Sequence, residues 1–192
     1  MYNKPQIHEI VLLVNGYPRS GKDTFAKFIE EEFKYDPSKL DVHFENISTV
    51  SYIKKAARDY FDWDGEKDEK GRRLLADLKD ASRLYNEGPF NFACQQRSIN
   101  YTTVCLKRPL LFVSVIHSRE PEEIQMFKNH FGDICRTVFI KRDIEQELSN
   151  HADRNVEDYK YNYTINNNSD IKAFKKKCNK FINNLFKKIS KV

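Results

Sequence analysis

The chain has 192 residues, of which 32% are charged, and its formal net charge at pH 7 is +5. This length suits one domain with a real core, and so mild a positive charge favours small anionic ligands over a dedicated nucleic-acid-binding role. The four cysteines are far apart and form no Cys-x-x-Cys pair, so free buried thiols are expected and a zinc site is not. The sequence has no signal-peptide pattern and no apolar run that could span a bilayer. We therefore expect a protein of the reducing cytoplasm or, if a virus encodes it, of the cytoplasm of the infected host.

A strand, a glycine loop and a helix are the first predicted elements. Residues 10–14 are branched and apolar, which indicates a buried strand, and residues 24–33 space their apolar side chains as a helix does. Between them, Gly16-x-x-x-x-Gly21-Lys22 matches the P-loop, in which backbone N–H groups and a helix N-terminus surround phosphate and the lysine reaches the outer phosphates. The residues expected to contact nucleotide phosphates are Gly16, Arg19, Ser20, Gly21, Lys22, Asp23 and Thr24.

The residue after Lys22 departs from the usual P-loop pattern. Ser or Thr is expected there to hold magnesium, but the chain has Asp23, with Thr24 one position later. A carboxylate can approach Mg²⁺ directly or through a water, and without the metal it would repel the phosphates. Alternatively, Asp23 caps the N-terminus of the helix, where negative charge is favourable. The two interpretations are compatible, and Asp23 is the candidate metal ligand.

The rest of the chain alternates strand-like and helix-like segments. Further strands are predicted at residues 41–48, 110–117, 134–141 and 161–165, and helices at 49–61, 71–85, 90–104, 120–131 and 170–189. This alternation predicts an α/β fold, with a five-stranded, mostly parallel sheet covered by helices on both faces. We find no internal repeat, so residues 1–192 are expected to form a single domain.

The apolar spacing of two predicted helices bears on how they pack. The helix predicted at 170–189 is rich in lysine, which could suggest a membrane or RNA surface, but its apolar residues form a continuous stripe that predicts packing on the core. The helix predicted at 71–85 places Leu74, Leu75, Leu78, Ala81 and Leu84 or Tyr85 on one stripe.

The motif Arg-Ser-Gly-Lys-Asp-Thr, at residues 19–24, resembles the P-loop small-molecule kinases. It is most similar to the bacteriophage-type deoxynucleoside monophosphate kinases and more distantly to animal phosphomevalonate kinase and adenylate kinases, which also delay the threonine by one residue. The resemblance implies a three-layer P-loop kinase fold that uses ATP and Mg²⁺. It also implies an acceptor-binding helical region at about 49–105 and a short lid at about 142–158.

Basic residues between the second and third predicted strands are candidates for binding the acceptor. They are Lys54, Arg58, Arg72, Arg73, Lys79 and Arg83, and the segments that carry them resemble those that surround the monophosphate acceptor in the family. Of these, Lys54, Arg72 and Arg73 are the predicted substrate-binding residues. Solvated surface charge is the alternative for any one of them.

After the third predicted strand, His-Ser-Arg-Glu-Pro-Glu-Glu resembles a family motif with an Asp, then an Arg and a later Glu. Arg119 and Glu123 fit that motif, and the resemblance implies a catalytic role for Arg119. His117 stands in the Asp position, where a neutral imidazole could accept a proton but binds Mg²⁺ poorly. A structural histidine at a strand end is the alternative interpretation.

The segment after the fourth predicted strand corresponds to the family's lid. The resemblance implies that Arg142 and Arg154 close over the transferred phosphate, and His151 shares its position with a family histidine. Arg142 therefore joins Lys22 and Arg119 as the predicted catalytic set. The turn before the last helix, at residues 165–170, is similar to a family turn near the adenine of the donor.

The first expectation for function is transfer of the terminal phosphate of ATP to a nucleoside or deoxynucleoside monophosphate. Other acceptors keep the same donor: phosphomevalonate, dephospho-coenzyme A or a nucleic-acid 5′ end. A nucleotide-dependent switch, or a nucleotide-binding protein with weak activity, is a third reading, but the Asn-Lys-x-Asp motif of such switches is absent from the sequence. Small nucleotides are the expected partners, without membrane or nucleic acid, and homodimer formation is left open.

Overall fold

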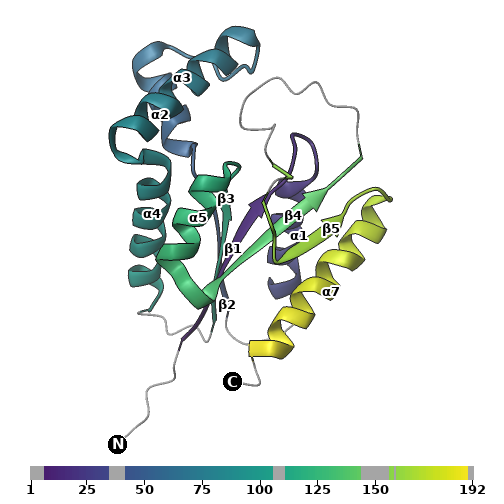
Figure 1. Cartoon of the computed structure of the whole chain (residues 1–192). Helices are drawn as coiled ribbons and strands as arrows, with labels where there is room; N and C mark the ends of the chain where they lie inside the picture. The colour runs from purple at the N-terminus through teal and green to yellow at the C-terminus, as the bar shows by residue number, and fades with distance from the viewer. Residues whose placement is uncertain (1–6, 35–41, 106–110, 144–155, 158, 190–192) are drawn as a thin grey trace, which may run out of the picture.

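A central sheet organises the chain in the computed structural model, which describes residues 7–34, 42–105, 111–143, 156–157 and 159–189. Its strands are β1 (His8–Asn15), β2 (Val42–Ser48), β3 (Leu111–His117), β4 (Cys135–Lys141) and β5 (Tyr163–Asn166). Their order is β2-β3-β1-β4-β5, and all four pairings are parallel. The carboxyl ends of the strands therefore meet at one edge, with β1 in the centre (Figure 1).

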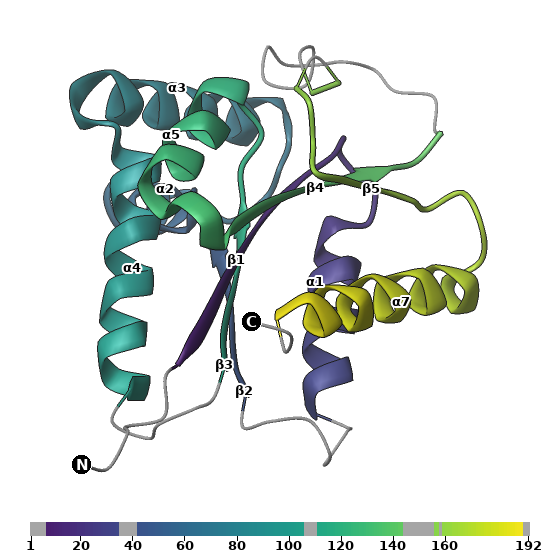
Figure 2. The ribbon, with the colours of Figure 1, turned by 60° about the horizontal axis from the view of Figure 1, so that its bottom comes forward.

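Helices cover both faces of the sheet, which confirms the predicted α/β fold (Figure 2). One face carries α1 (Lys22–Lys34) and α7 (Ile171–Ile189), and the other carries α4 (Gly88–Cys105) and α5 (Pro121–Phe131). Helices α2 (Ser51–Phe61) and α3 (Glu69–Asn86) stand beyond the carboxyl edge, and a short 3₁₀ helix, η1 (Gly132–Ile134), leads into β4. None of the described helices combines the length and apolar character that crossing a bilayer requires.

Strand β1 is buried on both of its faces. Leu12 and Val14 pack towards α1 and α7, whereas Val11 and Leu13 pack towards α4 and α5. A strand that is covered twice needs apolar residues at consecutive positions, which explains the unbroken apolar run in the sequence. In α7 the buried stripe is Phe174, Cys178, Ile182 and Leu185, so the helix packs on the core as its periodicity predicts.

Three of the cysteines are free thiols, as expected. Cys135 and Cys178 are buried and Cys94 is half-buried. Burial raises the pKa of Cys94 and of Cys135 to about 11, and that of Cys178 to about 12. These side chains are therefore neutral, weakly nucleophilic thiols at pH 7.

Helix α3 differs from its prediction at both ends. It begins at Glu69 because the side chain of Asp68 caps it, accepting a hydrogen bond of 2.7 Å from the backbone N of Gly71. The end of its apolar stripe is not covered, since Leu84 is 80% and Tyr85 88% exposed. The periodicity predicted the helix correctly but not its environment, because α3 packs on α2 and α4 and lies beyond the sheet.

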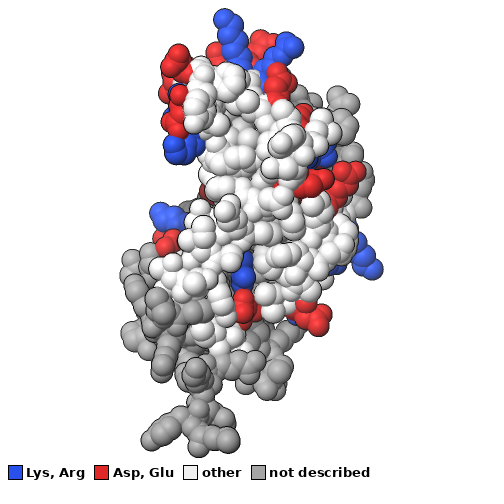
Figure 3. Space-filling view, turned by 90° about the vertical axis from the view of Figure 1, so that its left-hand side faces the viewer, with Lys and Arg blue, Asp and Glu red and all other residues white. Residues whose placement is uncertain are grey.

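The outer side of α4 presents almost no charge. Arg97 is the sole charged residue of this helix and is buried, so the exposed side chains are uncharged ones such as Gln95 and Ile99. Figure 3 shows the same side of the molecule, with a large uncharged surface and charged side chains gathered towards α3.

A buried polar network joins α4 to the sheet. Arg97 donates hydrogen bonds to Ser114 Oγ (3.0 Å) and Glu9 Oε2 (2.6 Å). Ser114 and Asn100 in turn donate to the carboxylate of Glu45, at 2.6 and 2.7 Å. Burial raises the pKa of Glu45, although both hydrogen bonds act in the opposite direction. Each member therefore depends on the others for its buried hydrogen bonds.

Removing Arg97 should cost the fold much of its stability. We expect Arg97→Ala to lower the free energy of unfolding by about 3 kcal/mol, because it leaves buried acceptors without their charged donor. Urea unfolding followed by the fluorescence of Trp63 measures this change. The control is Arg73→Ala, an exposed arginine, which should change stability by less than about 0.5 kcal/mol. Equal losses in the two variants would contradict a stabilising role for the network.

Candidate active site

The loop between β1 and α1 has a backbone that requires glycine at two positions. Gly16 has φ of 151° and Gly21 of 102°. A β-carbon at Gly16 would lie 2.5 Å from Ile140 O, and one at Gly21 would lie 2.5 Å from Asn167 Nδ2. Any side chain at either position would clash with these neighbours. Arg19 also has a positive φ, of 60°, which is uncommon for a non-glycine residue, and its side chain is exposed.

Lys22, the first residue of α1, folds back over this loop. Its Nζ donates hydrogen bonds to the backbone oxygens of Gly16 (2.6 Å) and Tyr17 (2.7 Å). These acceptors are neutral carbonyls, and a phosphate would offer charged acceptors that form stronger bonds. The ammonium is thus already held at the mouth of a loop whose shape suits an anion.

A cavity of about 450 Å³ opens beside the loop, which is large enough for a small ligand. Its lining comprises Arg19, Gly21, Lys22, Asp23, Thr24, Arg142, Asn167, Ser169, Asp170 and Ile171. Five of the seven predicted phosphate-contacting residues are in this set. Gly16 and Ser20, the other two, are buried. The structure also brings Arg142 to this cavity, where its Nη1 donates to the backbone oxygen of Arg19 at 3.3 Å.

Two buried asparagines hold the loop in place. Asn15 donates from Nδ2 to the backbone oxygen of Arg119 (2.9 Å) and to the hydroxyl of Tyr161 (2.7 Å). Asn167 donates from Nδ2 to the backbone oxygen of Ser20 at 2.8 Å. Asn15 was not among the residues predicted for the site. A polar residue that ends a fully buried strand directly before a P-loop glycine is the signal that could have identified it.

A second group of charged residues is close enough to Asp23 to feel its charge. Burial is the main cause of the lowered pKa of Lys54, and the positive charges of Lys67, Arg58 and Arg119 add to the effect, whereas Asp23 opposes it. Lys54 of α2 is therefore close enough to Asp23 and Arg119 for their charges to act on it. Arg58 and Lys67, which were not among the predicted substrate-binding residues, belong to the same basic environment.

His117 belongs to this second group. Burial lowers the pKa of His117 to about 4, helped by the positive charges of Lys22, Arg119 and Lys54 and opposed by Asp23. Its imidazole is therefore neutral at pH 7. His117 Nε2 lies 2.8 Å from Asn46 Oδ1, an acceptor, so Nε2 carries the proton in this arrangement and Nδ1 is the acceptor.

The lowered pKa of His117 predicts a specific pH dependence of stability. Between pH 6.5 and 4, His117 is mostly protonated in the unfolded chain but mostly neutral in the folded protein. The unfolded state therefore gains proton-binding free energy, and the fold loses stability, as the pH falls through this range. From pH 7 to pH 5, wild type should lose about 1–2 kcal/mol more unfolding free energy than His117→Gln does. Urea unfolding at the two pH values checks this difference. Parallel losses would mean that His117 titrates normally in the folded protein.

Some predicted residues lie elsewhere or are not described. Arg72 and Arg73 are exposed on α3, do not line the cavity, and Arg73 lies 3.8 Å from Asp77 on the same helix. His151 and Arg154 fall outside the described residues. Of the proposed substrate-binding set, the structure thus brings only Lys54 towards the P-loop.

The residues of this site fit a magnesium ion that arrives with phosphate. No cluster of three or more His, Cys, Asp or Glu side chains that could enclose a metal occurs among the described residues. Mg²⁺ commonly uses one or two carboxylates together with substrate phosphates and water. Asp23 is exposed and lines the cavity beside Thr24, so it could supply the one carboxylate. It also lies in the first turn of α1, so its capping role remains compatible with this.

The two roles of Asp23 predict different titrations. If its carboxylate contacts Mg²⁺, Asp23→Asn should weaken magnesium-dependent ATP binding roughly tenfold and leave metal-free binding unchanged or tighter. Calorimetric titrations with and without Mg²⁺ measure both affinities. Asp170→Asn is the matched control, because it removes the same charge from another part of the cavity lining and should shift both titrations alike. Equal shifts for Asp23→Asn would reduce this residue to a helix cap.

No family model matches the sequence, and no curated protein does. The solved structures to which the chain is similar include a mutant of the Mycobacterium tuberculosis APS kinase CysC (11% identity, TM-score 0.42), a dephospho-CoA kinase from Campylobacter jejuni (14%, 0.46) and a shikimate kinase from Bacteroides thetaiotaomicron (12%, 0.44). The alignments cover 94%, 92% and 92% of this chain and 99%, 97% and 98% of those chains, respectively. Scores this low describe a distant likeness and assign no activity to this chain.

Proposed function

We propose that this protein is a kinase that uses ATP and Mg²⁺ to phosphorylate a nucleoside or deoxynucleoside monophosphate. One observation carries the proposal: Asp23 lines the P-loop cavity and its charge also acts on Lys54 and His117, so two basic sites adjoin it. One is the cavity beside the P-loop, and the other is the group formed by Lys54, His117 and Arg119. Phosphoryl transfer needs two anionic substrates held in line with cations around the transferred group, and adjoining basic sites suit that requirement.

The side chains divide the work between donor and acceptor. Lys22 and the N-terminus of α1 would hold the donor phosphates, and Arg142 would add positive charge from the end of β4. Arg119 would face the transferred phosphate from the β3–α5 loop (residues 118–120), and Lys54 would hold the phosphate of the acceptor. Mg²⁺ held by Asp23 would offset negative charge on the phosphates when it is bound.

Arg72, Arg73 and His117 have smaller parts in the proposed reaction. Arg72 and Arg73, exposed on α3, remain candidates for the outer part of the acceptor. His117 is neutral at pH 7, so the positive charge around the acceptor phosphate would come from Lys54 and Arg119. Little proton transfer by the protein is needed, because positioning and charge dominate this reaction.

A nucleic-acid end fits the site less well as an acceptor. Acidic residues follow α2 at Asp62, Asp64, Glu66 and Asp68, all of them exposed. They interrupt any basic path that a polynucleotide backbone would need beyond its terminal phosphate. The uncharged side of α4 offers no such path either (Figure 3).

A panel of acceptors tests the proposal. Purified protein is incubated with ATP and Mg²⁺ and with each nucleoside and deoxynucleoside monophosphate, phosphomevalonate, dephospho-coenzyme A or a 5′-hydroxyl oligonucleotide, and ADP release is followed. A mononucleotide should give the highest kcat/KM. Faster phosphorylation of the oligonucleotide or of a non-nucleotide acceptor would overturn the acceptor assignment. Absence of turnover with every acceptor would overturn the kinase assignment itself.

A further inference from the structure

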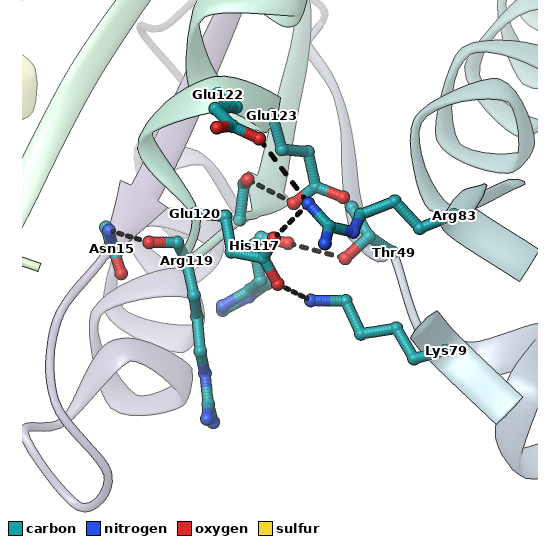
Figure 4. Close-up of polar contacts among 10 residues, drawn as sticks. Asn15, Thr49, Lys79, Arg83, His117, Arg119, Glu120, Glu122 and Glu123 are labelled. Carbon is teal, nitrogen blue, oxygen red and sulfur yellow. Dashed lines mark hydrogen bonds and ion pairs between the residues drawn. The ribbon is translucent and has the colours of Figure 1, made fainter. Parts of the chain in front are cut away.

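Two cations of α3 contact one carboxylate of the β3–α5 loop. Lys79 Nζ lies 2.6 Å from Glu120 Oε1, and Arg83 Nη1 lies 3.1 Å from Glu120 Oε2 (Figure 4). Arg83 Nη1 also lies 3.4 Å from Glu122 Oε2. Glu120 therefore joins α3 to this loop through both of its oxygens, from two successive turns of the helix.

Burial separates the contacts of Glu120 from that of Glu122. The side chain of Glu120 is 19% exposed and that of Lys79 is 16% exposed, whereas that of Glu122 is 85% exposed. Exposed ion pairs contribute little because water and salt screen them, and shielded pairs are screened much less. The contact that can hold α3 in place is thus the one made by Glu120.

The loop that carries Glu120 is itself fixed to the sheet. Thr49 Oγ1 donates to the backbone oxygen of His117 at 3.1 Å, and Asn15 Nδ2 donates to that of Arg119 at 2.9 Å. Arg119 and Glu120 are neighbours in the chain, yet the guanidinium of Arg119 points away from the glutamates (Figure 4). Through Glu120, helix α3 is therefore held at a defined place relative to Arg119.

Helix α3 is in turn hydrogen-bonded to α2. Tyr52 OH of α2 and Ser82 Oγ of α3 lie 2.6 Å apart and share a hydrogen bond. Ser82 directly precedes Arg83, and Tyr52 lies two residues before Lys54, the proposed ligand of the acceptor phosphate. A connected series of contacts thus leads from Glu120 through α3 to the helix that carries Lys54.

We propose that Glu120 is a positioning residue that holds α3 and α2 against the β3–α5 loop, and so sets the distance between Lys54 and Arg119. This inference rests on the proposed function, because it concerns how the acceptor is placed for transfer. Lys79 and Arg83 then hold the acceptor-binding helices in position, and the acceptor phosphate is left to Lys54 and Arg119.

Steady-state kinetics with the best monophosphate acceptor test the role. Glu120→Gln should raise the KM for the acceptor roughly tenfold and leave the KM for ATP within about twofold, because the P-loop cavity does not include Glu120. Glu122→Gln removes a neighbouring charge and should leave both constants within about twofold. Glu120→Asp, which keeps the charge, should recover part of the loss. Equal effects of Glu120→Gln and Glu122→Gln would overturn the positioning role.

Hydrogen exchange separates this inference from the proposed function. Backbone amides of residues 69–86 should exchange faster in Glu120→Gln than in wild type or Glu122→Gln, whether or not the acceptor is correctly identified. Lys79→Met, which removes one of the two contacts, should give an intermediate increase. Unchanged exchange in both variants would overturn the inference and leave the proposed function intact. Absence of turnover in wild type would overturn the proposed function, and with it the role in acceptor placement.

Discussion

Lys22→Ala is expected to lower kcat by at least about 10²–10³-fold, the effect of removing one preorganised donor from the charge that develops during transfer. Lys22 Nζ lies at the mouth of the P-loop, bonded to the backbone oxygens of Gly16 and Tyr17. Those bonds can be exchanged for bonds to the outer phosphates without moving the helix that carries the lysine. Lys22→Ala therefore removes an interaction between the ammonium and the outer phosphates that becomes stronger as negative charge builds up on them in the transition state.

The protein should remain folded without the Lys22 ammonium, because this side chain is half-buried at the edge of a cavity. Thermal unfolding measured beside the kinetics checks this. Lys27→Ala is the matched control: it removes an exposed lysine from the same helix, whose ion pair with Glu31 is long, at 3.9 Å. It should leave kcat unchanged within about twofold. Near-normal turnover with Lys22→Ala would reject the assignment of this loop to the donor phosphates.

Arg119→Met is the second change with a large expected effect, a loss of about 10³-fold in kcat, comparable to the removal of an arginine that stabilises the transferred phosphate. Methionine keeps an unbranched apolar stem of similar shape but removes the charge and the planar donors. Arg119 is held through its backbone oxygen by Asn15, so the substitution should leave the loop in place. The KM for ATP should change much less than kcat.

Arg119→Lys distinguishes charge from geometry. Lysine keeps the positive charge but cannot offer two parallel donors to one phosphate, so it should recover only part of the lost activity. Arg136→Met, near the amino end of β4, is the control and should leave kcat unaltered. A kcat for Arg119→Met within about twofold of wild type would exclude this arginine from the reaction.

The parts of the site that the sequence predicts are those encoded by neighbouring residues. Gly16, Gly21 and Lys22 lie within one short segment, and the strand and helix around them follow from local apolar spacing. The structure confirms the elements and gives the glycines a steric reason, since Ile140 and Asn167 leave no room for a β-carbon. The motif is recognisable because the residues that define it are close together in the sequence, although remote residues supply the steric reason for its glycines.

The parts that the sequence does not predict depend on which strands become neighbours. Asn15 bonds to Arg119 because β1 and β3 are adjacent and end together, and Asn46 meets His117 because β2 lies beside β3. The contact between Glu120 and α3 likewise joins segments that are remote in the sequence. Periodicity identifies strands and helices but not their order in the sheet, so these pairs could not be read from the chain.

The central place of β1 has a consequence for how the protein is made. Both partners of this strand lie far downstream, since β3 ends about 100 residues after β1 and β4 follows it. At usual rates of translation, roughly 5–20 s pass between synthesis of the P-loop and synthesis of the first strand that can pair beside it. During that interval the apolar residues of β1 have no neighbouring strand, so the nascent chain exposes an apolar segment that favours aggregation. Under the proposed function, ATP could bind and stabilise the fold only after β3 and β4 have been synthesised, because only then does the P-loop have both of its neighbouring strands.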